Sequence, residues 1–392
     1  MLHERTSPGD ALDLARELDA RPVDALADVD AEEWDALVPP GAAPLLHAYV
    51  AAWLNAELAG LEERPLAARD DEGTLLAAAP GFLYDLDIAN IQTPLLARIV
   101  GAVRKLVPRL LMLRIYEVGS AAAGIDPLAL RHPDLDPLEA ADSLLEAARR
   151  EGDRKGANLS IVQDLADQGS PTARALRRRG FRPVPLPPTL VAELPFDSFD
   201  EYLDAMRSQY RRRARKVLDE SSHLRVEQLR EFADLAPELA RLWKLVYDRA
   251  TEMRREVLPE RFFREASEVE QTRLLLLRRE DDSIACFALL LDDSPWLHFL
   301  YTGFEEDAGR EEGAYFRLLY EIARIAIEEE DFERVNFGIT TEAPKMDAGA
   351  RPVPLTAWLR HRNRLLLHLF WKLATGPFAP EPVEARRVFK ED

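Results

Sequence analysis

The sequence predicts an α/β protein made of two tandem domains, each a mixed β-sheet flanked by helices. The chain has 392 residues, more than one ordinary domain needs and enough for two buried cores. Both halves also follow one order of elements: helices, a β-meander, then helix, strand, helix and strand. A meander favours antiparallel pairing, whereas a strand–helix–strand unit requires a parallel crossover. We therefore expect each sheet to be mostly antiparallel and splayed at one parallel edge.

In the first half, helical spacing of apolar residues and short apolar runs between turn residues predict the elements. Asp30 is a candidate cap for the first helix, and Asp70-Asp71-Glu72-Gly73 is a candidate hairpin turn. The expected helices cover 30–37, 44–58, 92–106, 136–151 and 170–179. The expected strands lie around Leu66 and at 75–84, 111–118, 158–162 and 181–194, the last interrupted by prolines.

The second half repeats this pattern. Its three central strands are separated by the acidic turns 280–282 and 292–293. The expected helices cover 198–218, 232–253, 259–267, 311–329 and 365–375. The expected strands cover 224–229, 272–278, 284–291, 296–301, 334–338 and 354–359. The domain limits that follow are an N-terminal extension at 1–22, a first domain at 23–195 and a second at 196–380.

Composition narrows the class of protein. The net charge of −19 disfavours DNA as a partner, because an acidic surface repels phosphates. No apolar run is long enough for a membrane span, and the first residues lack the pattern of a signal peptide, so we expect a soluble, cytoplasmic protein. The single cysteine, Cys286, lies in an apolar run and is expected in the core. High Ala, Arg and Leu usage suggests a GC-rich bacterial genome.

Basic residues form two local patches that a phosphorylated ligand could use. The first patch contains Arg207, Arg211, Arg212, Arg213, Arg215 and Lys216, and the second contains Arg351, Arg360, Arg362, Arg364 and Lys372. On a helix, Arg211 and Arg215 share one face and are candidates for binding a phosphorylated donor. The alternative is a solvated helix face on which these cations pair with nearby carboxylates.

Several stretches resemble one superfamily. They are FDEYLDAMRSQYRRRARK at 199–216, NFGITTEAPKMDAGARPVPL at 336–355, DVDAEEWDAL at 28–37 and LLAAAPGFLY at 75–84. In order and motif these are similar to tandem members of the GNAT superfamily, the Fem-type aminoacyltransferases and their bacterial relatives. The resemblance covers most of residues 24–375. It implies two GNAT-like domains, the first on the acceptor side and the second on the donor side and catalytic.

The donor loop departs from the superfamily's pattern. Many acetyl-CoA-binding GNAT domains have Arg/Gln-x-x-Gly-x-Gly/Ala before the central helix, where backbone N–H groups hold the pyrophosphate. Here Arg310 and Gly313 supply the cation and the first glycine, but Tyr315 replaces the small residue and two acidic residues lie between. Arg310 and Gly313 are therefore candidate donor-binding residues. The alternative is an ordinary helix start.

Candidate catalytic residues follow from what acyl transfer to an amine requires: a route for the proton and donors for the oxyanion. Lys345 lies in a predicted polar loop and is a candidate for holding a donor phosphate or stabilising the oxyanion, or else an exposed loop lysine. Tyr301 is a candidate acid for the leaving group, or else a cross-strand aromatic. Glu117 is a candidate base, or else an ordinary strand-end carboxylate. Asn336 and Gly338 end a strand where a donor could approach the backbone.

The function expected from these features is acyl transfer from acetyl-CoA or another acyl-CoA to an amine of a small molecule or peptide. The alternative donor is an aminoacyl-tRNA, as in Fem-like peptide bond formation for cell walls or natural products. A non-catalytic, degenerate GNAT pair that only binds partners is the third interpretation. The seven histidines lack metal-ligand spacing, so no metal is expected.

Overall fold

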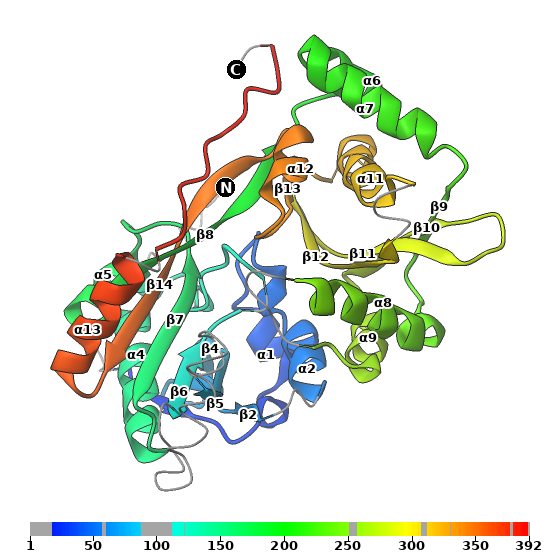
Figure 1. Cartoon of the computed structure of the whole chain (residues 1–392). Coiled ribbons are helices and arrows are strands. Elements are labelled where there is room, and N and C mark those ends of the chain that lie inside the picture. Colours follow the sequence, from blue (N-terminus) through cyan, green and yellow to red (C-terminus); the bar gives the residue numbers. More distant parts are fainter. Residues whose placement is uncertain are drawn as a thin grey trace, which may run out of the picture.

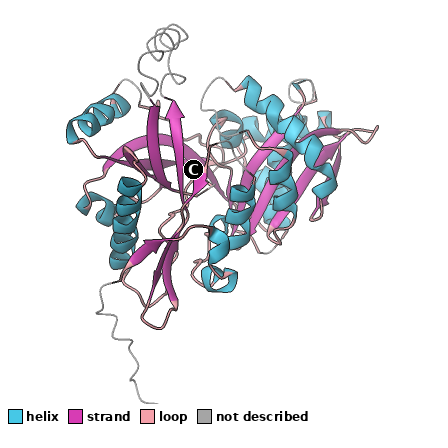
Figure 2. Ribbon diagram, turned by 90° about the horizontal axis from the view of Figure 1, so that it is seen from below, coloured by secondary structure: helices cyan, strands magenta, loops and turns pink. Residues whose placement is uncertain are grey.

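The computed structural model describes residues 18–56, 60–87, 112–120, 122–250, 257–306, 312–329, 331–376 and 379–390. The expected helix at 92–106 and the candidate Arg310 lie outside these residues. The described strands form one small sheet and one wide sheet, and helices pack against them (Figures 1 and 2). The mixed α/β class is confirmed.

The small sheet has the order β1 (Ala20–Pro22), β3 (Leu66–Arg69), β4 (Leu75–Ala79). Its β3–β4 hairpin turns where the sequence predicts, with the Asp70 carboxylate accepting hydrogen bonds from the N–H groups of Glu72 and Thr74. The single strand predicted at 75–84 is wrong, since β4 and β5 (Gly81–Asp87) belong to different sheets. Pro80 has no N–H to continue the ladder, and a Cβ on Gly81 would collide with the carbonyl oxygen of Arg64.

The wide sheet has eleven strands in the order β2-β5-β6-β7-β14-β8-β13-β12-β11-β10-β9. The remaining strands before residue 195 are β2 (Glu62–Glu63), β6 (Met112–Val118), β7 (Leu159–Leu165) and β8 (Arg182–Glu193). Those after it are β9 (Arg225–Leu229), β10 (Thr272–Arg278), β11 (Ile284–Asp293), β12 (Trp296–Phe304), β13 (Arg334–Asn336) and β14 (Arg351–His361). Within it β6–β7 and β12–β13 are parallel and the other pairs antiparallel, one parallel pair for each half.

The two halves of the sequence are not separate sheets. β14, from near the C-terminal end, lies between β7 and β8 and pairs with both. β8 pairs with β14 through Arg182–Val191 and with β13 through Val191–Glu193, so one long strand carries the sheet from one half to the other. The predicted boundary at 195 therefore falls just after β8, while the sheet of the first half needs a strand from beyond that boundary.

The described helices lie near the ranges that apolar periodicity predicts, except that one predicted helix is broken and α12 was not predicted. Those of the first half are α1 (Ala31–Asp35), α2 (His47–Asn55), α4 (Pro137–Arg154) and α5 (Pro171–Arg178). Those of the second are α6 (Phe199–Ala205), α7 (Ser208–Glu220), α8 (Ala236–Arg249), α9 (Glu260–Ser267), α11 (Ala314–Glu328), α12 (Glu342–Asp347) and α13 (Arg364–Thr375). The single helix predicted at 198–218 is wrong: Met206 and Arg207 are extended, and the Arg207 N–H donates to the carbonyl of Val388.

Two apolar cores hold the second half together. One joins α6, α7 and α11 to the sheet, and its largest contribution is the buried face of α11, for example Leu318, Ile322 and Ala326. The other joins α8 and α9 to the opposite face through residues such as Phe262 and Phe287. These two cores fix α8 and α11 on either side of β12, which is where the candidate site lies.

Candidate functional site

The parallel strands β12 and β13 separate after a short contact. They pair only through Trp296–His298 and Arg334–Asn336. Beyond that point β12 continues beside β11 as far as Phe304, whereas Phe337 and Gly338 exchange backbone hydrogen bonds with Leu190 of β8. This gap is the splayed parallel pair that the sequence predicts for the second half.

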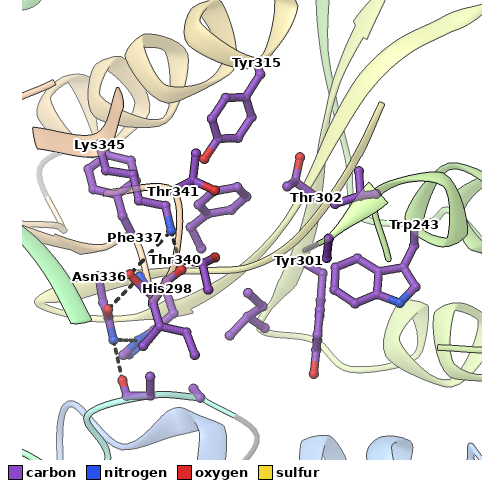
Figure 3. A pocket seen from close by; sticks show the side chains of 18 of the residues that line it. Trp243, His298, Tyr301, Thr302, Tyr315, Asn336, Phe337, Thr340, Thr341 and Lys345 are labelled. Carbon is purple, nitrogen blue, oxygen red and sulfur yellow. Dashed lines mark hydrogen bonds between the residues drawn. The ribbon is translucent and has the colours of Figure 1, made fainter. Parts of the chain in front are cut away.

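A cavity of about 200 Å3 occupies this gap (Figure 3). Its walls come from β12, from the chain after β13, from α8 and from the start of α11, and Ala122 and Ala123 of the first half close one side. Most of the lining is apolar, including Trp243, Phe299 and Phe337. An apolar pocket with a few polar groups is the usual form of a small-molecule site.

β12 carries a bulge at the cavity wall. Phe299 pairs with Leu290 and Tyr301 with Leu289, so Leu300 is an extra residue without a partner in this register. A bulge takes the extra residue out of the regular ladder and re-aims it, and such bulges are common beside active sites. Because Leu300 lines the cavity, the bulge turns irregular backbone toward it.

The chain after β13 is held in a strained conformation by Lys345. Gly338, Thr340 and Thr341 all have positive φ angles, of +70°, +66° and +52°. That region suits glycine but is costly for a β-branched residue. The Lys345 ammonium donates to the carbonyls of Ile339 at 2.7 Å and Gly338 at 3.4 Å. The lysine therefore fixes the shape of this wall.

Lys345 is not the loop residue that the sequence predicts. It lies on α12 and is 4% exposed, with its Nζ 5.9 Å from the centre of the Phe299 ring. The polar residues around Lys345 in the sequence indicated a loop, but its neighbours Met346 and Asp347 are buried too. The structure thus removes the exposed-lysine alternative and puts a buried cation at the cavity wall.

Asn336 joins the two halves of the molecule at the closed end of the cavity. Its Oδ1 accepts hydrogen bonds from the Thr189 hydroxyl at 2.7 Å and the Gly338 N–H at 3.0 Å. Its Nδ2 donates to the carbonyl of Ala123 at 2.9 Å and lies 3.4 Å from His298 Nδ1. The amide thus has protein partners in each of its hydrogen-bonding directions, and its clearest part in the structure is to connect β13, β8 and the first half.

His298 and Asp293 extend this network, and sequence reasoning missed both. His298 is 1% exposed, and its Nε2 lies 3.0 Å from Asp293 Oδ2. The Asp293 carboxylate also accepts the N–H groups of Gly41 at 3.1 Å and Ala43 at 2.8 Å. The available signal was a histidine among alternating apolar residues in WLHFLY, but its partners come from distant parts of the chain.

The start of α11 differs from an open phosphate site. Gly313 is left-handed, with φ of +65°, and precedes the first turn as predicted. However, Glu312 is paired with Arg279 at 2.9 Å. Tyr315 is 7% exposed and forms a side-chain hydrogen bond with Thr341 across the gap, while burial raises the pKa of its hydroxyl. Tyr315 thus links α11 to the wall opposite β12.

The structure separates Tyr301 from Lys345. Tyr301 is 2% exposed and contacts Trp243 and Phe262 edge-on, with ring centroids 5.2 and 5.4 Å apart. In Figure 3 its ring points away from Lys345 and Tyr315, on the side of the strand that faces α8. Tyr301 therefore borders the cavity near its backbone. Its hydroxyl points into the core that α8 and α9 form with the sheet.

Three further candidates do not line the cavity. Glu117 of β6 is 8% exposed and accepts a 2.5 Å hydrogen bond from the Tyr84 hydroxyl within the first half. Arg211 and Arg215 share a face of α7 as predicted, but both contact Asp204, at 3.8 and 3.0 Å between the charged atoms. α7 packs on α11, which lies between α7 and the sheet (Figure 1).

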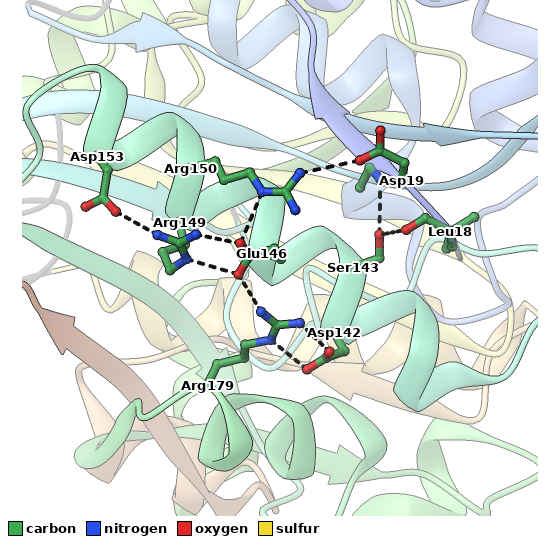
Figure 4. Close-up of polar contacts among 10 residues, drawn as sticks. Leu18, Asp19, Asp142, Ser143, Glu146, Arg149, Arg150, Asp153 and Arg179 are labelled. Carbon is green, nitrogen blue, oxygen red and sulfur yellow. Dashed lines mark hydrogen bonds and ion pairs between the residues drawn. The ribbon is translucent and has the colours of Figure 1, made fainter. Parts of the chain in front are cut away.

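A second concave region beside α4 is filled with ion pairs. Its volume is about 570 Å3, and Arg179 pairs with Asp142 and Glu146 along its edge (Figure 4). Hydrogen bonds from Arg149 are the largest cause that lowers the Glu146 pKa from 4.5 to about 2. Since these charges satisfy one another, the region is better explained as a stabilising surface network than as a ligand site.

Two findings concern the described residues only. Within them, no group of three or more His, Cys, Asp or Glu side chains is placed to hold a metal ion. No helix in the same described ranges has the length and apolar character to cross a membrane.

The family described as acetyltransferase (GNAT) domain matches residues 204–346. This match covers about a third of the chain and lies within the second half. Among solved structures, FemX is 14% identical with a TM-score of 0.59, covering 87% of this chain and 98% of that one. A tandem GNAT protein from the clavulanic acid biosynthesis pathway is 14% identical with a TM-score of 0.50, covering 88% and 99%. The resemblance to tandem GNAT proteins and the tandem GNAT fold are thereby confirmed.

Two further similarities extend this comparison. The C-terminal domain of a provisionally named lysylphosphatidylglycerol synthetase from Agrobacterium fabrum is 15% identical with a TM-score of 0.55, covering 90% of this chain and 98% of that one. A Mycobacterium tuberculosis protein provisionally named 8-amino-7-oxononanoate synthase 2 is 27% identical over 298 residues, which are 74% of this chain. The match spans only 38% of that relative's length.

Proposed function

We propose that this GNAT protein transfers an acyl group from an activated donor to an amine, with the reaction in the cavity between β12 and β13. The observation that carries the proposal is this cavity, which opens where the two parallel strands separate and which the bulge at Leu300 borders. In such a gap the free backbone of β12 can hydrogen bond a donor arm and the oxyanion that forms during attack.

The remaining walls fit the other requirements of the reaction. The apolar lining suits an acyl group and keeps water from it. The buried Lys345 ammonium places positive charge beside the position of the developing oxyanion and keeps the wall at 338–341 in shape. Ala122 and Ala123 bring the first half to the cavity, so we place the acceptor amine on that side. The neutral amine attacks the acyl carbonyl to form the C–N bond, and the donor's C–S bond, or C–O bond in an aminoacyl-tRNA, then breaks. The amine loses its proton to solvent or acceptor-side groups, and the leaving thiolate or ribose oxygen takes up a proton from solvent.

We favour an acyl-CoA as the donor, because Tyr315 in the first turn of α11 lines the same gap and Gly313 caps that turn. One observation favours the second candidate, an aminoacyl-tRNA. Tyr315 bonds Thr341 across the gap, and the Glu312–Arg279 pair occupies the approach to the helix N-terminus. Both contacts must open for a pyrophosphate to reach α11. The FemX likeness bears on the fold and is compatible with either donor.

A transfer assay with three donors tests the proposal. Acetyl-CoA, a longer acyl-CoA and an aminoacyl-tRNA are each combined with a panel of amines, and binding is followed by the rise in melting temperature. The panel includes 8-amino-7-oxononanoate, the amino-oxo acid in the name of the M. tuberculosis relative. We expect acyl-CoA to raise the melting temperature and to acylate at least one amine. Stabilisation by the aminoacyl-tRNA alone would select the second donor.

The control is a variant with a filled cavity, Val246→Trp, at a partly buried position of α8 that lines the cavity. We expect it to lose both donor stabilisation and transfer. Binding of donor by this variant as strongly as by the wild type would place the donor elsewhere. No stabilisation by any of the donors would leave the degenerate binding pair as the better interpretation.

A further inference from the structure

α13 presents an apolar face that the described part of the chain leaves exposed. The helix packs against β8 and β14, with Leu367 buried and the Trp371 Nε1 donating to the carbonyl of Pro183 at 2.9 Å. Four leucines remain outside this contact. Leu365, Leu366, Leu369 and Leu373 are 81%, 41%, 51% and 38% exposed.

The exposed leucines form one continuous stripe. Leu365, Leu369 and Leu373 follow each other at intervals of four residues, and Leu366 adjoins them, so all four lie on one side of the helix. Of the six large apolar side chains that are exposed in the described residues, these are four. Single exposed leucines are ordinary, but a contiguous patch marks an interaction site.

The surroundings of this stripe are basic, although the protein as a whole is acidic. Residues 348–380 contain five Arg or Lys side chains and no Asp or Glu, in a chain of net charge −19. Four of them, Arg360, Arg362, Arg364 and Lys372, lie on α13 or just before it, whereas Arg351 begins β14 at its other end, where it pairs with Val191. Arg182 adds a further cation, since its guanidinium lies 5.3 Å from the centre of the Trp371 ring and 3.1 Å from His368 Nδ1.

Carboxylates of α4 lie near two of these cations, Arg360 and Arg362. The Arg362 Nε lies 4.0 Å from Asp153 Oδ1, so this ion pair is a loose one. The pKa of Arg360 is lowered, mainly by burial. The positive charges of Arg149 and Arg364 also lower it, whereas the carboxylates of Asp153 and Glu146 raise it. The patch around α13 therefore combines exposed leucines with an excess of positive charge.

We propose that α13 docks on an anionic lipid surface, with its leucines in the boundary between headgroups and acyl chains. Leucines on one helix face with Arg and Lys at its margins are what such interfacial binding requires. The charge argues against a second copy of this chain on the same face. A twofold interface brings identical patches together, and here it would oppose cations with cations.

This proposal is independent of the proposed acyl transfer. No residue of α13 lines the cavity, and α13 packs against β8 and β14, apart from β12 in Figure 1. A variant of the leucine stripe should therefore keep its activity on water-soluble substrates, so loss of lipid binding and loss of catalysis are separable results.

The test is co-sedimentation of the full chain with vesicles of phosphatidylcholine, with or without phosphatidylglycerol. We expect binding to the anionic vesicles that weakens as salt is added. The double variant Leu365→Ser/Leu369→Ser should weaken this binding at least about tenfold. Val257→Ser is the matched control, because Val257 is 43% exposed but lies outside α13. It should bind as the wild type does.

A probe on the helix gives a second measurement. Leu369→Cys can be labelled selectively with an environment-sensitive fluorophore, because Cys286 is completely buried. Its emission should shift to the blue with anionic vesicles and not with neutral ones. Wild-type protein that does not sediment with anionic vesicles, or that binds neutral vesicles equally well, would overturn the proposal. A dimer that the leucine variant dissociates would assign the stripe to a second copy.

Discussion

The two parallel strand pairs of the wide sheet end differently. In the first half β6 stops at Val118, which still pairs with Val162 of β7. In the second half β12 runs six residues beyond its last pairing with β13, from Phe299 to Phe304. The chain after β6 instead crosses to the second half, where the Ala123 carbonyl accepts from Asn336.

This difference divides the work between two domains of one fold. Within the described residues, β12 of the second half extends past its parallel contact and lines the cavity, whereas β6 of the first half ends where its contact with β7 ends. The first half uses the equivalent segment to close one side of that cavity. In the proposed function the second half supplies the reaction site and the first half covers it, and the hydrogen bonds of Asn336 with Ala123 and His298 connect the two halves.

The largest expected effect comes from removing the open gap of the second half. Val246→Trp places an indole in the cavity, and we expect kcat/KM to fall by ~100-fold or more, because a misplaced donor loses its reactive geometry. Leu138→Trp, at a half-buried position on α4 of the first half, is the matched control and should change kcat/KM little. Steady-state kinetics measures both. Equal losses would mean that the two halves share the reaction.

Lys345→Met should have the next largest effect. It keeps the length of the side chain but removes the donors to the carbonyls of Ile339 and Gly338. We expect kcat to fall by about 10- to 100-fold and unfolding by urea to show a loss of about 1–3 kcal/mol. Glu117→Gln is the comparison in the first half and should leave kcat within about threefold. A larger loss for Glu117→Gln would restore Glu117 as a base.

A smaller effect is expected on the pH dependence of stability, to which the ion pairs of Glu146 in the first half contribute. In the first half, Arg149 holds the folded-state pKa of Glu146 at about 2, below its ordinary 4.5. Such a group stabilises the fold above about pH 4.5, and this contribution is lost as the pH falls toward 2. Glu146→Gln should therefore lower the melting temperature at neutral pH. It should also make the melting temperature fall less steeply as the pH is lowered from 5 to 3. Identical pH profiles for variant and wild type would contradict this role of the network.

The smallest effect is expected from the basic helix. Arg211→Ala/Arg215→Ala removes two cations that both contact Asp204, an exposed arrangement worth about 0–1 kcal/mol. We expect donor KM to change less than about twofold. Asp204→Asn is the control for loss of the ion pairs alone. A tenfold rise in KM confined to the arginine variant would restore these residues as donor-binding groups.

Much of the fold was predictable because local signals dominate it. Periodicity placed the helices, and Asp70–Gly73 placed the first hairpin. The order of elements predicted one parallel pair in each half. What failed depended on distant partners. Pro80 and Gly81 split a strand because Arg64 lies against them, and Arg207 interrupts a helix because Val388 takes its N–H.

The site was less predictable for the same reason. Lys345, Asn336 and Gly338 were recognisable because their motif is local. The contacts of Asn336, however, are with Thr189, Ala123 and His298, which come from three other segments. No spacing rule in a single sequence indicates that Asp293 orients His298 while accepting from Gly41 and Ala43. The hydrogen bond between Tyr315 and Thr341 across the gap also joins two distant segments, and their spacing in the sequence does not indicate it.

The position of β14 has a consequence for how the chain is made. Residues 194–350, 157 in number, are synthesised between β8 and the strand that pairs with most of it. Until β14 emerges, β7 and β8 present edges with unpaired backbone groups, which are prone to wrong pairing. The usual order, in which an N-terminal domain folds while the next is still being translated, is therefore closed to this protein. Its first half can be finished only when the chain as far as His361 has left the ribosome.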